Sequence, residues 1–248
     1  MSPLLLLVLL TLPQAEAQPP AKAEPTEGEL ILEKVQRALA SNVVVRFTVN
    51  TENQTWMTFE NGGAECRTQV TLATLDLRPG NRLTIDGRFP IGELKWPAVP
   101  NQADSDWMIL ESDGKSMKVT PYSGSEAARM DTPKRLNENL LRDFLYLGVR
   151  QSVVERLKTL TQSKPSRDAE LLRDSAVTLL GREKLDEKEV LKLELKPRKS
   201  TGPATTSTFL WIDAKTHLPL RREARTQGAA WHKVDTERYN EFGTDPFN

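Results

Sequence analysis

Gly114-Lys115-Ser116 is the part of the sequence that most resembles the phosphate-binding motif of an enzyme. That motif requires another glycine at a fixed distance before the first one, and this position is occupied by Ile109. The tripeptide also follows Ser112-Asp113 between two extended segments. This pattern is typical of a β-hairpin, whereas the phosphate motif joins a strand to a helix. We therefore interpret Gly114 as a turn glycine.

Residues that bind metals or act as nucleophiles are scarce. The chain has two histidines and one cysteine, so a zinc site would require His217, His232 and Cys66 to converge from distant positions. No serine lies in the Gly-x-Ser-x-Gly motif of serine hydrolases. The acidic cluster at 186–189 is typical of an exposed turn and does not place two carboxylates across a cleft. The sequence thus favours a protein that is not an enzyme, with no metal and no cofactor.

The charge balance argues against nucleic acid as a partner. The 248 residues include 34 basic and 34 acidic side chains, so the net charge is zero. Charged clusters such as Arg221-Arg222 are interpreted as solvent-exposed faces. One cysteine cannot form an intramolecular disulfide, and no internal segment has the roughly 20 apolar residues of a membrane-spanning helix. These features predict a globular protein in solution.

Residues 1–17 are typical of a secretory signal peptide. An apolar run precedes Ala15-Glu16-Ala17, the small-x-small pattern that signal peptidase recognises, and we place cleavage before Gln18. A hydrophobic leader before an internal start is the alternative. No cysteine follows the apolar run, so no lipid-modified N-terminus is expected. Residues 18–28 are rich in Pro, Ala and Glu and are predicted to form a flexible tether. A periplasmic or secreted location follows.

Residues 29–248 are predicted to form a single α+β domain. Residues 29–40 have apolar side chains at helical spacing, and Thr26 with Glu29 matches a capping box. A second helical region covers 137–160, with a break at Gly148. The remaining segments alternate with period two between short turns, which predicts an antiparallel meander of about ten strands. The expected strands are 43–50, 54–60, 69–77, 82–85, 107–111, 115–122, 176–184, 188–196, 205–213, 218–226 and 233–242.

Some strands are apolar on both faces, which bears on function. In 205–213, Phe209 and Trp211 share one face while Leu210 and Ile212 share the other. Either both sides of the sheet have a core, or a curled sheet covered by helices on its concave side leaves a groove for an apolar guest. An acyl chain in such a groove would gain roughly 0.8 kcal/mol per buried CH₂. The residues predicted to bind this ligand are Val45, Phe47, Trp56, Phe59, Leu72, Trp107, Ile109, Phe144, Phe209 and Trp211.

The order of the elements resembles the bacterial outer-membrane lipoprotein carrier family (LolA) and its relatives, which include a sensor domain of the envelope stress response. The most specific match is a hairpin at 210–221, which resembles the family pattern "l.vD..t.lP.r". The other matching segments are the first helix at 30–35, the apolar strand with Phe47, LRPGNR at 77–82, DGK at 113–115 and YNEF at 239–242.

The resemblance implies a half-barrel, which is an incomplete curved antiparallel sheet with helices over an apolar cavity. It also implies transport of acylated lipoproteins without a cofactor. Arg46 is the candidate for the strand arginine that holds the family's lid helices. This chain departs from the family in Met117 and Val119, which replace an aromatic pair, and in a long loop at 89–106 and a charged insertion at 162–174. The departures favour a divergent member with another apolar ligand or a protein partner.

The leading hypothesis is a secreted carrier or binding protein that accommodates a lipid, an acyl chain or a lipoprotein. The alternative is an envelope sensor or scaffold that acts through protein–protein interaction, with an envelope membrane protein as a further partner. An enzyme is the third hypothesis, and it would require a buried polar constellation in the cavity.

Overall fold

The computed structural model describes residues 24–41, 44–60, 62–88, 107–121, 127–162, 167–199 and 203–243. The expected signal peptide, most of the expected tether and the loop at 89–106 lie outside these residues, so these assignments stay predictions. The first helix begins at Glu27, within the segment that was expected to be tether.

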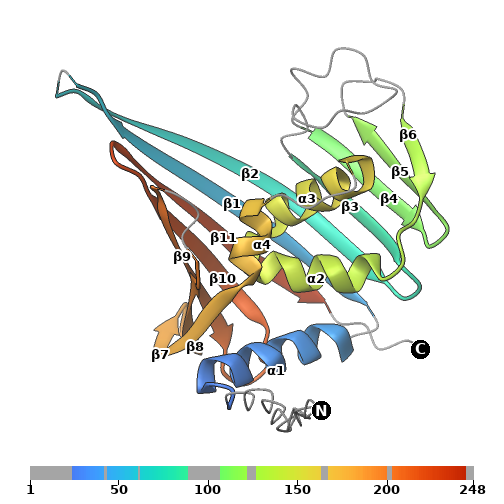
Figure 1. Cartoon of the computed structure of the whole chain (residues 1–248). Coiled ribbons are helices and arrows are strands. Elements are labelled where there is room, and N and C mark those ends of the chain that lie inside the picture. Colours follow the sequence, from blue (N-terminus) through green and yellow to red (C-terminus); the bar gives the residue numbers. More distant parts are fainter. Residues whose placement is uncertain are drawn as a thin grey trace, which may run out of the picture.

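The described strands form one antiparallel sheet of eleven strands. Their bounds are β1 Val45–Thr58, β2 Ala64–Arg78, β3 Arg82–Arg88, β4 Trp107–Asp113, β5 Ser116–Pro121, β6 Ala128–Asp131, β7 Ser175–Leu185, β8 Lys188–Pro197, β9 Thr205–Asp213, β10 Pro219–Gln227 and β11 Trp231–Gly243. The order across the sheet is β6-β5-β4-β3-β2-β1-β11-β10-β9-β8-β7, with β6 and β7 at the two edges (Figure 1). The predicted fold, an open and curved antiparallel half-barrel, is confirmed, with eleven strands where about ten were expected.

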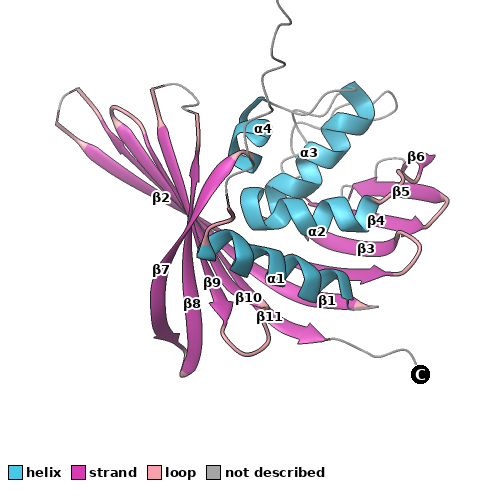
Figure 2. Cartoon of the chain, turned by 60° about the horizontal axis from the view of Figure 1, so that its bottom comes forward, coloured by secondary structure: helices cyan, strands magenta, loops and turns pink. Residues whose placement is uncertain are grey.

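The helices of the described residues form a second layer on one side of the sheet. They are α1 Glu27–Ser41, α2 Leu136–Leu147, α3 Val149–Gln162 and α4 Arg167–Arg173. Figures 1 and 2 show them against the concave side of the curved sheet, as predicted. α1 packs against β7, and α2 contacts each of the other three helices.

Two local signals in the sequence have the predicted hydrogen bonds. The Thr26 N–H donates to the Glu29 carboxylate at 2.9 Å and the Glu29 N–H donates to the Thr26 hydroxyl at 3.2 Å, so the capping box of α1 is confirmed. Asp113 accepts the N–H groups of Lys115 and Ser116, each at 2.7 Å, in the hairpin between β4 and β5. The start of α1 and the turn between β4 and β5 are therefore each fixed by residues close in the sequence.

The core lies between the concave face of the sheet and the helices. On β1, Val45, Phe47 and Val49 are buried on the face toward the helices, while Arg46 is exposed on the other face. The ring of Phe47 lies 5.9 Å from that of Phe144 in α2. The period of two thus sorts the side chains of β1 onto the faces that the sequence indicates.

Two strands differ from the prediction. β1 is one strand of 14 residues where two shorter ones were expected, because the polar segment 50–54 pairs with both β2 and β11. β6 was not expected, since a strand of four residues is too short to show a periodic pattern. The break between α2 and α3 at Gly148 is where it was predicted.

Candidate functional site

A small apolar cavity lies between the sheet and helices α2 and α3. Its volume is about 10 Å³, which is enough for about one water molecule. This cavity is therefore far smaller than the expected groove. The residues that line the cavity are Phe47, Leu75, Leu77, Leu140, Leu141, Phe144, Val149, Ser152 and Val153.

Three of the predicted ligand-binding residues lie in or beside this cavity. Phe47 and Phe144 line it, and Val45 is buried in the same core. Ile109 alternates with buried neighbours on β4, so its partly exposed side chain faces away from the helices. Trp107 begins β4, and its side chain lies outside the described ones.

Three further predicted residues lie away from the cavity. Trp56, near the end of β1, stacks on His232 of β11 with 4.4 Å between the ring centroids. Phe59 follows β1 and is 46% exposed. Leu72 is 47% exposed, on the face of β2 opposite the helices. A ligand-binding role for these residues stays a prediction.

Phe209 and Trp211 lie on the face of β9 that points away from the helices, because Leu210 between them is buried in the core. Trp211 is nevertheless only 4% exposed. The cationic groups of Lys192 and Arg221 lie 4.8 and 4.7 Å from its ring centroid. Cation–π contacts within the sheet therefore cover this tryptophan, as expected if both sides of the sheet are packed.

A polar cluster joins the sheet to the corner between α2 and α3. Arg222 of β10 and Glu237 of β11 lie opposite each other on neighbouring strands and are 3% and 2% exposed. Arg222 Nη2 donates to the carbonyl oxygen of Tyr146 at 2.9 Å, and Glu237 Oε1 accepts the N–H of Val149, also at 2.9 Å. The Tyr239 hydroxyl donates to Glu237 Oε2 at 2.7 Å. We call Arg222, Glu237 and Tyr239 the corner clamp.

The corner clamp provides partners for backbone groups at the helix ends. Glu237 accepts one of the N–H groups that the first turn of α3 leaves unpaired, where the helix dipole favours a negative charge. Burial raises the pKa of Glu237, while Arg222, the Tyr239 hydroxyl and the Val149 N–H act to lower it. Burial, together with the Glu237 carboxylate, raises the pKa of Tyr239 well above its ordinary value, so its hydroxyl remains a donor at neutral pH.

Gly148 makes the close approach of the clamp to the helices possible. Its φ of 83° and ψ of 164° lie in a region that is open almost only to glycine. A Cβ atom here would lie 2.6 Å from Glu237 Oε1 and 2.9 Å from Arg222 Nη1. Gly148 therefore has two roles: it separates α2 from α3, and its lack of a side chain lets the clamp approach the backbone.

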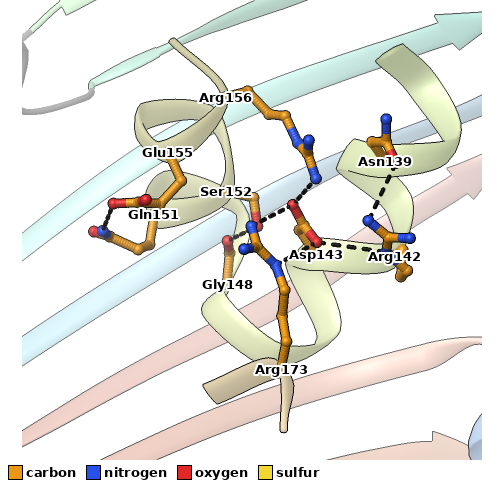
Figure 3. Close-up of polar contacts among 9 residues, drawn as sticks. All are labelled: Asn139, Arg142, Asp143, Gly148, Gln151, Ser152, Glu155, Arg156 and Arg173. Atoms are coloured by element: carbon orange, nitrogen blue, oxygen red, sulfur yellow. Dashed lines mark hydrogen bonds and ion pairs between the residues drawn. The ribbon is translucent and has the colours of Figure 1, made fainter. Parts of the chain in front are cut away.

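A second polar cluster joins three helices to one another (Figure 3). Asp143 of α2 is fully buried and accepts hydrogen bonds from Arg156 of α3 and Arg173 of α4. Arg173 binds both carboxylate oxygens, at 3.0 and 2.9 Å, and Arg142 Nε lies 3.7 Å from the same carboxylate. Helices α2, α3 and α4 are thus tied to one another by contacts that do not involve the sheet.

The arginine that contacts the helices is not the one expected. Arg46 lies on the opposite face of the sheet, where its guanidinium pairs with Asp76 at 2.9 Å. Arg222 contacts the helix corner instead, and the exposed position predicted for it is wrong. The sequence holds a signal for its burial, because Arg222 has the same strand phase as Ala224.

No family model matches the chain, and no curated protein matches it. Among similar solved structures, LprF from Mycobacterium bovis is 13% identical with a TM-score of 0.44, over 91% of this chain and 97% of that one. A LolA superfamily protein from Nitrosomonas europaea is 13% identical with a TM-score of 0.31, over 89% and 94%. A structure of the Pseudomonas aeruginosa MucA/MucB complex is 12% identical with a TM-score of 0.37, over 90% and 59%.

Within the described residues, no group of three or more His, Cys, Asp or Glu side chains could hold a metal ion. No described helix is long and apolar enough to cross a membrane. The absence of a cofactor and of catalysis stays a prediction.

Replacing Gly148 with alanine is expected to lower the free energy of unfolding by about 2–4 kcal/mol, because backbone strain adds to a clash with the clamp. Gly62→Ala is the control, since Gly62 has a similar φ of 80° but no atom within 4 Å of the added Cβ. Urea denaturation measures both variants. Equal losses in G148A and G62A would contradict the contact between Gly148 and the clamp.

Asp143→Asn is expected to lower the free energy of unfolding by about 3 kcal/mol, because two arginines that are 20% and 23% exposed lose their carboxylate. Asp76→Asn is the matched control. Asp76 also pairs with two arginines, but these are 48% and 52% exposed, so the loss is expected to stay below about 1 kcal/mol. Thermal and urea unfolding compare the two, and a reversed order would show that Asp143 does not hold the helices together.

Glu237→Gln is expected to change how stability depends on pH. The fold raises the pKa of Glu237 above 4.5. The folded state therefore binds this proton more tightly than the unfolded state does, and protonation of Glu237 stabilises the fold. The stability of the wild type relative to E237Q should be greatest below pH 4.5 and should fall as pH rises through the folded pKa. Urea unfolding at several pH values between about 4 and 8 measures this difference. A difference that grows with pH would mean that the fold lowers this pKa.

Proposed function

We propose that this chain is an exported binding or carrier protein, without catalytic activity, that takes up an acyl chain between helices α2 and α3 and the sheet. The supporting observation is the apolar lining on both sides of this contact. Phe47, Leu75 and Leu77 face it from the sheet, and Leu140 and Phe144 face it from α2. The expected partners are a lipid, an acyl chain or a lipoprotein.

Uptake requires the helices to move away from the sheet, because the present cavity holds about one water molecule. Two kinds of cost oppose this movement. The apolar side chains lose their contacts. Hydrogen bonds between the layers are also lost: those of the corner clamp to Tyr146 and Val149, and those of Asn137 in α2 to the turn between β2 and β3. A guest that buries several methylenes, at roughly 0.8 kcal/mol each, offsets the first cost by replacing the lost contacts.

The alternative is a module that acts through protein–protein interaction. The observation that favours it is a pair of apolar residues on the face of β2 opposite the helices, where Val70 is 65% and Leu72 is 47% exposed. An interface there would not require the helices to move. The two functions therefore predict different residues.

Leu141→Asn, at the edge of the cavity, is expected to weaken the binding of a dansyl-labelled undecanoic acid about tenfold, because a polar group replaces an apolar contact with the chain. Leu72→Asn makes the same substitution on the opposite face and is expected to leave the affinity within about twofold. Fluorescence titration of the three proteins gives the dissociation constants.

Circular dichroism of both variants confirms that each is folded before the titration. A wild-type protein that does not bind the probe would overturn the proposal and favour the interaction module. A larger loss in L72N than in L141N would move the acyl site to the face that carries Leu72, as the sequence-based assignment of that residue predicts.

A further inference from the structure

The sheet has a second cavity, at the end where β7 turns into β8. It lies between the turn that joins β7 to β8 and the strands β10 and β11, and its volume is about 120 Å³. This volume corresponds to roughly four water molecules at the density of liquid water. The residues that line it are Leu185, Asp186, Lys188, Leu220, Arg221, Arg238, Tyr239 and Asn240.

The side chains of Arg221 and Arg238 are on the outer face because of the strand period. Arg221 alternates with Arg222 and Arg238 alternates with Glu237, and both of these neighbours point toward the helices. Arg221 and Arg238 are also direct partners in the β10–β11 ladder. Two like charges in this arrangement repel each other. Glu223 provides a counter-charge for Arg221, whereas Arg238 has none within the described residues.

Three cationic side chains and one acidic side chain line the cavity: Lys188, Arg221, Arg238 and Asp186. Glu223, outside the lining, pairs with Arg221. Lys188 acts electrostatically on Asp213. Arg238 is therefore the cation of the lining that has no acidic partner within the described residues.

The existing contacts of the cavity leave cationic donors free. Arg221 donates to Glu223 and covers the ring of Trp211, but its buried Nε has no hydrogen-bond partner within the described residues. Arg238 is exposed and has no hydrogen bond or ion pair in the described part of the chain. Lys188 acts electrostatically on Asp213, whose Oδ1 already accepts two backbone N–H groups.

We propose that this cavity binds an anionic group of the phosphate class, with Arg238, Lys188 and Arg221 as the binding residues. A guanidinium matches the geometry of phosphate oxygens, and an ammonium group adds a compact positive charge. The bound anion supplies Arg238 with the counter-charge that it lacks within the described residues. Free phosphate and the headgroup of a phospholipid offer the same chemistry.

Inorganic phosphate titrated into ¹⁵N-labelled protein tests the site. We expect saturable shifts in the amide signals of residues 186–188, 221 and 238–240. Arg238→Gln and Lys188→Gln should each weaken binding at least about fivefold. The charge-matched control Arg67→Gln, on a guanidinium that pairs with Glu65 in β2, should change it less than about twofold.

Sedimentation with vesicles separates the two sources of phosphate. Binding to phosphatidylglycerol vesicles that is lost in R238Q and kept in R67Q supports the site with a lipid headgroup as its ligand. Phosphate binding without vesicle binding supports the site with a free phosphate-class ligand. The proposal is overturned if neither ligand binds, or if R238Q and R67Q lose affinity equally. L141N should bind phosphate like the wild type, so failure of the acyl proposal and failure of this one are distinguishable.

Discussion

The position of the helix layer on the sheet depends on how the polar backbone groups at the ends of α2 and α3 are hydrogen-bonded. The corner between α2 and α3 brings backbone N–H and C=O groups into a buried region, where an unpaired group costs about 1–3 kcal/mol. Arg222 and Glu237 supply the partners from the sheet, and Gly148 supplies the space. Sliding of the helices would leave these groups unpaired, so the corner clamp fixes the position of the helix layer.

Most of the fold could be predicted because its signals are local. The capping box of Thr26 and Glu29, the turn at Asp113 and the break at Gly148 each act within a few residues. Alternation along each strand then indicates which side chains share a face, and short turns indicate which strands pair. The ends of β1 and the existence of β6 were missed because polar or very short segments carry little periodic signal.

The candidate site was harder to predict because strand periodicity does not say which face is covered. Phe209 and Leu210 are both apolar, and only the packing of the helices shows that Leu210 faces them. The same ambiguity applies to Arg46 and Arg222. The alternation shows which neighbours share a face with each arginine, but it does not show whether that face is the one covered by the helices. Deciding between them requires the cross-strand register, which brings Arg222 opposite Glu237.

The way the helix layer is attached also bears on what can bind beneath it. Asp143 ties α2, α3 and α4 to one another, while apolar contacts, the corner clamp and the hydrogen bonds of Asn137 hold them to the sheet. Moving the helices separates the corner clamp from the backbone groups of Tyr146 and Val149, and each buried polar group left unpaired costs about 1–3 kcal/mol. A small polar guest buries too little apolar surface to replace the contacts that are lost between helices and sheet. A long acyl chain replaces them, because each methylene that it buries gains roughly 0.8 kcal/mol.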